Sequence, residues 1–142
     1  MMKGLIVDFG GVLTDRGPDG VGEPPLIGAV LAAREAGIRT ALLSNADGPG
    51  EPIPWLDRLF QVLVFSGDVG VAKPDAAIYR LAVERLGLEP GECVFVDDLA
   101  VNVRGAVAAG LVGVHHTSIP STLAELAVLL GVDFAGGRSC NG

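Results

Sequence analysis

Cysteine, histidine and basic residues are scarce in this sequence of 142 residues. It has two cysteines and two histidines, and its 10 Lys and Arg residues face 17 Asp and Glu residues, which leaves a net charge of −7. Two cysteines do not make a disulfide framework, and His115 and His116 lack the further partners that a zinc site needs. An acidic surface attracts neither nucleic acid nor anionic membrane, so we expect neither as a partner.

Long apolar runs are missing as well. No stretch approaches the roughly 18 uncharged apolar residues of a membrane span, and the N-terminal apolar run reaches Asp8 too soon to be a signal peptide. We therefore expect a reduced, cytoplasmic protein. Hydrophobic residues make up 49% of the chain and charged residues 19%, which predicts one well-packed domain. We place this core domain at residues 1–134 and a loose C-terminal tail at 135–142.

Short apolar runs alternate with helical patterns along the chain. The predicted strands cover 4–8, 39–44, 62–66, 93–97 and 112–115. Most of them do not alternate with polar residues, which is typical of strands buried on both faces of a parallel sheet. The predicted helices cover 24–37, 73–87, 99–110 and 120–131, and each ends at a glycine. The pattern predicts an α/β fold: a Rossmann-like three-layer sandwich with a mainly parallel five-stranded sheet.

Polar residues follow directly after several of the predicted strands. Asp8 ends the first strand, Ser44 and Asn45 end the second, and Asp97 and Asp98 end the fourth. In open α/β sheets, ligands bind at the carboxyl ends of the strands. We therefore expect these side chains to form one site at that edge of the sheet.

Four segments together resemble the haloacid dehalogenase (HAD) superfamily of aspartate-nucleophile hydrolases. They are "DFGGVLTD", "LLSNA", "GVAKPD" and "VFVDDLAVN", and the resemblance covers residues 3 to about 131. The "DD…N" form of the last segment is similar to the branch that includes epoxide-hydrolase-associated phosphatase domains. The resemblance implies a Mg²⁺-dependent phosphatase that forms an aspartyl-phosphate intermediate, acting on a small phosphorylated substrate or a phosphorylated macromolecule.

The chemistry and the resemblance together assign roles to the residues of the predicted site. Asp8 is expected to be the nucleophile, because a carboxylate that attacks phosphorus splits the hydrolysis into two easier steps. Asp8 and Asp98 form the natural pair of Mg²⁺ ligands. The resemblance adds the carbonyl of Gly10 as a third ligand.

Other residues are expected to support these groups. Lys73 neutralises negative charge during catalysis, and Ser44 and the backbone amides after it, from Asn45 on, are expected to join Lys73 in binding the phosphoryl oxygens. Asp97 is expected next to the metal as a supporting or alternate ligand, and Asn102 is expected to orient Asp98 or a metal-bound water.

The sequence departs from the family pattern in two places. The family's phosphatases carry a general-acid aspartate two residues after the nucleophile, and here that position is Gly10. Asp15, Thr14 or Asp47 could substitute for it, and the spacing selects none of them. The segment 16–25 is short where many relatives insert a cap domain, so we expect a HAD-like core without a cap and an open site.

Two other functions remain open at this stage. One is a binding or regulatory module that keeps the fold and metal site with little or no catalysis, which the glycine and the missing cap favour. The other is a 2-haloacid dehalogenase, which the second segment fits but the adjacent acids Asp97 and Asp98 disfavour. A homo-oligomer is compatible with the apolar composition, and Trp55 is expected to serve packing.

Overall fold

The computed structural model describes residues 2–48, 50–51 and 53–134, and the predicted tail at 135–142 lies outside them. The elements, in chain order, are β1 (Gly4–Val7), η1 (Phe9–Leu13), α1 (Pro25–Glu35), β2 (Arg39–Ser44), α2 (Pro54–Leu59), β3 (Val62–Phe65), α3 (Ser66–Val69), α4 (Ala76–Leu86), η2 (Pro90–Glu92), β4 (Cys93–Asp97), α5 (Ala100–Ala108), β5 (Val112–His115) and α6 (Ile119–Leu130). All five predicted strands are present, with bounds that differ by at most one residue from the prediction.

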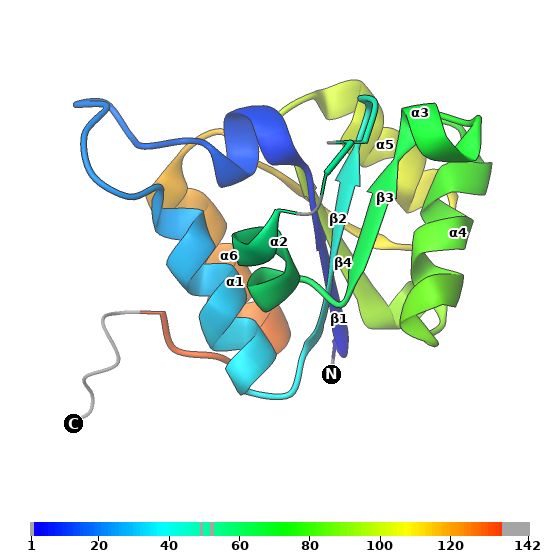
Figure 1. Cartoon of the computed structure of the whole chain (residues 1–142). Coiled ribbons are helices and arrows are strands. Elements are labelled where there is room, and N and C mark those ends of the chain that lie inside the picture. Colours follow the sequence, from blue (N-terminus) through cyan, green and yellow to red (C-terminus); the bar gives the residue numbers. More distant parts are fainter. Residues whose placement is uncertain (1, 49, 52, 135–142) are drawn as a thin grey trace.

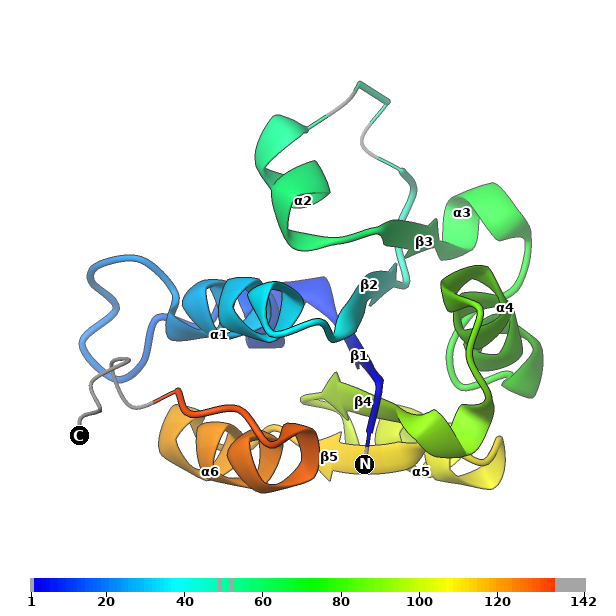
Figure 2. The same cartoon turned by 90° about the horizontal axis from the view of Figure 1, so that it is seen from below.

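The five strands form one sheet in the order β3-β2-β1-β4-β5, and every pairing is parallel. Helices α1 and α6 lie together on one face, and α4 and α5 lie together on the other (Figures 1 and 2). This is the predicted Rossmann-like three-layer sandwich. No cap domain is inserted between η1 and α1 or between α3 and α4.

The hydrophobic core has two parts, one on each face of the sheet, because β1, β2 and β4 are buried on both faces. Leu5 and Val7 face the α1/α6 side, whereas Ile6 faces the α4/α5 side. Burial of a side chain of this size contributes about 1.5–3 kcal/mol. The three central strands are therefore held firmly, and their carboxyl ends are fixed in space.

The sequence placed the start of one helix incorrectly and did not predict another helix at all. Helix α6 begins at Ile119, one residue before the predicted start, and its cap is Ser118, whose hydroxyl accepts the backbone N–H of Ser121. A proline at position 120 suits the first turn because it has no N–H to leave unbonded, so the cap lies before it. Helix α2, which carries Trp55, is not among the predicted helices. Trp55 packs against Phe9 with ring centroids 6.4 Å apart, which confirms its packing role.

No helix in the described residues combines the length and apolar character needed to cross a membrane.

Candidate active site

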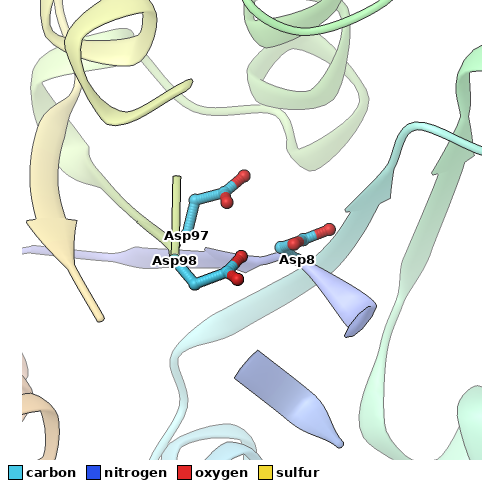
Figure 3. A group of neighbouring side chains, drawn as sticks. All are labelled: Asp8, Asp97 and Asp98. Atoms are coloured by element: carbon cyan, nitrogen blue, oxygen red, sulfur yellow. The ribbon is translucent and has the colours of Figure 1, made fainter. Parts of the chain in front are cut away.

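Three carboxylates meet at the carboxyl edge of the sheet, where the strand order switches direction between β1 and β4. Asp8 directly follows β1, Asp97 is the last residue of β4, and Asp98 follows it. Each offers an oxygen, and these oxygens all lie within 4.8 Å of one another. Figure 3 shows the Asp98 side chain pointing toward Asp8. The backbone fixes this geometry, since the N–H of Asp8 donates to the carbonyl of Val96 at 3.1 Å.

Lys73 is the cation that holds two of these carboxylates. Its Nζ donates to Asp8 Oδ1 and to Asp97 Oδ2, each at 2.9 Å, and to the carbonyl of Leu43 at 3.0 Å. Its side chain is 1% exposed and lies 5.5 Å from the centre of the Phe95 ring. All three ammonium protons are therefore used, and the position of the charge is fixed by the fold.

The side chain of Asn45 pairs with the backbone of Lys73, whereas the predicted phosphate contact is through the backbone amide. Its Oδ1 accepts the backbone N–H of Lys73 at 2.9 Å, and its Nδ2 donates to the Lys73 carbonyl at 3.0 Å. Both polar atoms of the amide are used in this pair, so Asn45 fixes the loop that carries Lys73. No local pattern predicts this pairing, because the two residues are far apart in the chain.

Ser44 is the other residue predicted to bind phosphate. It ends β2 and is buried, with 8% of its surface exposed. Within the part of the chain that the structure describes, no protein group is hydrogen-bonded to its hydroxyl. A buried polar group without a protein partner costs free energy unless a ligand or water satisfies it. The Ser44 hydroxyl is therefore available to bind a ligand.

Asp97 is fully buried and already saturated with donors. Its Oδ1 accepts the N–H of Leu99 at 2.9 Å, and its Oδ2 accepts from Lys73 and from Asn102 Nδ2 at 3.1 Å. Asn102 therefore orients Asp97, and the prediction that it orients Asp98 is wrong. The carbonyl of Asn102 is in turn bonded by the hydroxyl of Tyr79 at 2.6 Å.

Burial raises the pKa of the two remaining acids, Asp8 and Asp98. Burial raises the pKa of Asp8 above its ordinary value, and this effect outweighs the attraction of Lys73. Burial also raises the pKa of Asp98, and the neighbouring Asp97 adds to this. Three carboxylates share one lysine here, so two negative charges are left without a cation when all are ionised.

This set of groups fits a hard divalent cation. All the free donors are oxygens, the uncompensated charge is that of a dication, and Asp8 and Asp98 lie at the solvent side of the cluster while Asp97 is occupied. Mg²⁺ in proteins is held by one or two carboxylates and keeps several waters, so two available carboxylates are sufficient.

Gly11 lies against the site and leaves no room for a side chain. A Cβ at this position would lie 2.5 Å from Asp98 Oδ2, and the backbone has φ of +80°. Its neighbour Gly10 has φ of −69°, which any residue adopts, and a Cβ there would meet no atom within 4 Å. Gly11 is therefore required for space and conformation, whereas Gly10 is not.

These two glycines give a matched pair of variants. We expect Gly11→Ala to displace the Asp98 carboxylate and weaken Mg²⁺ binding by about 10- to 100-fold, the usual effect of disturbing the support of a metal ligand. Gly10→Ala should bind Mg²⁺ as the unmodified chain does. Isothermal titration with Mg²⁺ measures both. Equal affinities for the two variants would contradict a ligand role for Asp98.

A second polar cluster was not predicted. His116 is buried; its Nε2 lies 2.7 Å from Asp15 Oδ2, and its Nδ1 lies 2.6 Å from the Thr122 hydroxyl. The N–H of Gly17 donates to the other oxygen of Asp15, and this bond is the main reason that the pKa of Asp15 lies below its ordinary value. The cluster ties the segment after η1 to helix α6. His115 lies nearer the carboxylates, with Nε2 at 3.0 Å from the carbonyl of Asp98.

Comparison with known proteins defines the class of protein. The family model described as "haloacid dehalogenase-like hydrolase" matches residues 23–110, and the chain belongs to this family. The chain is 29% identical over 118 residues to bifunctional epoxide hydrolase 2 of Mus musculus, which agrees with the predicted resemblance. That match covers 78% of this chain and 21% of the mouse protein, so the chain spans about a fifth of the relative's length.

The chain matches nearly the whole length of two solved structures. An uncharacterized protein from Corynebacterium glutamicum is 37% identical, with a TM-score of 0.81 over 94% of this chain and 98% of that one. A HAD family enzyme from Bacteroides thetaiotaomicron has a TM-score of 0.64 at 19% identity, over 84% of this chain and 96% of that one, and shares the fold.

Proposed function

We propose that this chain is a Mg²⁺-dependent phosphatase that works through an aspartyl-phosphate on Asp8. The observation that carries the proposal is the position of Asp8, which lies between a buried, fully engaged lysine and a second carboxylate, Asp98. A carboxylate in this setting is held rigidly and can be balanced by one dication. The Asp8 side chain keeps 14% of its surface exposed, so a phosphate can reach it.

Each of the chain's own groups has a separate role in the reaction. An oxygen of Asp8 attacks phosphorus, and the bond to the leaving oxygen breaks; water then attacks the phosphorus, and the Asp8 carboxylate is released. Lys73 holds Asp8 in place and offsets its charge, and the Ser44 hydroxyl donates to a phosphoryl oxygen. Asn45 and Asn102 keep Lys73 and Asp97 in position. Asp8, Asp98 and the Gly10 carbonyl would hold Mg²⁺, which would supply positive charge that reduces the repulsion between carboxylate and phosphate.

Two observations support phosphoryl chemistry. The Bacteroides enzyme with the same fold is described in complex with magnesium and inorganic phosphate. In this chain, the adjacent acids Asp97 and Asp98 leave a charge that a dication balances, whereas displacement of halide from carbon needs no metal. The alternative of a binding module without catalysis keeps the same site and differs only in turnover.

Steady-state hydrolysis of para-nitrophenyl phosphate and acetyl phosphate tests the proposal. We expect release of phosphate that requires Mg²⁺ and stops on addition of EDTA. Tight Mg²⁺ binding with no turnover of either compound would favour the binding module. Release of chloride from 2-chloropropionate without Mg²⁺ would favour the dehalogenase.

A further inference from the structure

A phosphate ester normally needs a proton at its leaving oxygen. Asp98 is the expected metal ligand, and His115 is tested by substitution below; the other protonatable groups around Asp8 can be examined one by one. Lys73 has no proton to spare, because its three N–H groups bond Asp8, Asp97 and Leu43. Asp97 is fully buried and accepts from three donors. Neither group can transfer a proton without leaving a buried charge unpaired, which is costly.

The protonatable groups near the segment after η1 also have hydrogen-bond partners. Asp15 accepts from the Gly17 N–H and contacts His116, and its lowered pKa keeps it ionised at neutral pH. Both ring nitrogens of His116 are engaged, and its side chain is 3% exposed. The Thr14 hydroxyl accepts the N–H of Gly11 and belongs to a neutral alcohol, which is a poor acid.

The turn that surrounds the carboxylates offers one open position, and it has no side chain. Asp8 belongs to the cluster, and Gly11 touches Asp98. Gly10 lies between them, exposed, with free space where a Cβ would be. A side chain at this position would have free space on the exposed side of the turn, and a leaving group must also lie on the exposed side because β1, β2 and β4 are buried. Asp47, by contrast, lies against Gly67 at the β3 end of the edge and outside the cluster of three acids.

From this we infer the substrate class: phosphates whose leaving group departs as a stable anion without protonation, such as acyl, enol or aryl phosphates, and not simple alkyl phosphates. The inference rests on the proposed function. In the first step, the Asp8–phosphorus bond forms and the phosphorus–oxygen bond of the substrate breaks, with its electron pair leaving on an oxyanion. In the second step, water attacks phosphorus, the electron pair returns to the Asp8 carboxylate and the proton of water passes to solvent.

A series of phosphates with leaving groups of increasing pKa tests this class at constant pH and Mg²⁺. We expect kcat/KM to fall steeply from acetyl phosphate through the aryl phosphates to an alkyl phosphate. Gly10→Asp places an acid in the open position and should raise the alkyl-to-aryl ratio of kcat/KM by about 10²- to 10⁴-fold, the usual value of general acid help. Gly10→Asn, which has the same shape without the acid, should leave the ratio unchanged.

Three results would overturn the inference, and they can be told apart. Similar kcat/KM for alkyl and aryl phosphates in the unmodified chain would refute the substrate class and leave the phosphatase proposal standing. Alkyl phosphate turnover that His115→Gln abolishes would also refute it and assign the acid to His115, whose ring lies beside Asp98. No turnover of any phosphate by any variant would refute this inference together with the proposed function.

Discussion

Lys73→Met should lower the free energy of unfolding by about 3–5 kcal/mol, the usual cost of removing one partner from a buried ion pair. Methionine keeps much of the apolar stem but leaves Asp97, which is fully buried, without its cation. Asp8 and the carbonyl of Leu43 lose the same donor. Urea denaturation without Mg²⁺ at neutral pH measures the change. The deficit should shrink at acidic pH, because protonation of Asp8, whose pKa is raised by burial, removes part of the uncompensated charge.

Lys3→Met is the matched control for this variant. Lys3 pairs with Glu92 at 3.2 Å, but the two side chains are 65% and 31% exposed, and water screens such a pair. We expect its unfolding midpoint to remain almost unchanged. A loss of stability in Lys3→Met as large as in Lys73→Met would show that burial of the charge is not the cause.

Asp8→Asn is expected to have the largest effect on activity. The amide cannot attack phosphorus, so turnover should fall by about 10⁴-fold or more, as it does when other enzymes lose their nucleophile. The same substitution should stabilise the Mg²⁺-free protein at neutral pH, since it removes one of three carboxylates that share a single lysine. Lys73 keeps its bond to Asp97, so the variant should fold normally. Enzyme assay and urea denaturation of the same preparation give both quantities.

The pH dependence of that stability difference has a definite sign. Because the pKa of Asp8 is raised in the folded state, the folded protein binds this proton more tightly than the unfolded chain does. The contribution of Asp8 to stability is therefore full below its ordinary pKa of 3.8 and is lost as the pH rises through the raised value. The advantage of Asp8→Asn should grow over that range and then become constant. A difference that shrinks with rising pH would contradict the raised pKa.

Most of the fold could be predicted from sequence because the strands are short apolar runs and the helices end at glycines. The carboxylate cluster could also be predicted, since Asp97 ends a strand, Asp8 and Asp98 directly follow strands, and the edge of a parallel sheet brings strand ends together. Lys73 lies on a loop, and its place in the site came from the family resemblance.

The roles of the two asparagines could not be predicted, because each depends on hydrogen bonds between distant segments. Asn45 bonds the backbone of Lys73, and Asn102 bonds Asp97. A sequence shows which residues lie near strand ends but not which of two neighbouring acids an amide will bond. The turn over Phe9–Leu13, in which Gly10 and Gly11 have non-helical backbone angles, was not predicted either. The same turn brings Gly11 against Asp98, and so it shapes the site.

Trapping the covalent intermediate tests the central claim most directly. The chain is mixed with acetyl phosphate and Mg²⁺, quenched in acid within one turnover and digested, and the peptides are analysed by mass spectrometry. We expect one phosphoryl group on the peptide that contains Asp8, and none in the absence of Mg²⁺ or in Asp8→Asn. Phosphate release by the unmodified chain without any phosphoryl group on Asp8, or with the group on another residue, would contradict the assignment of Asp8 as nucleophile.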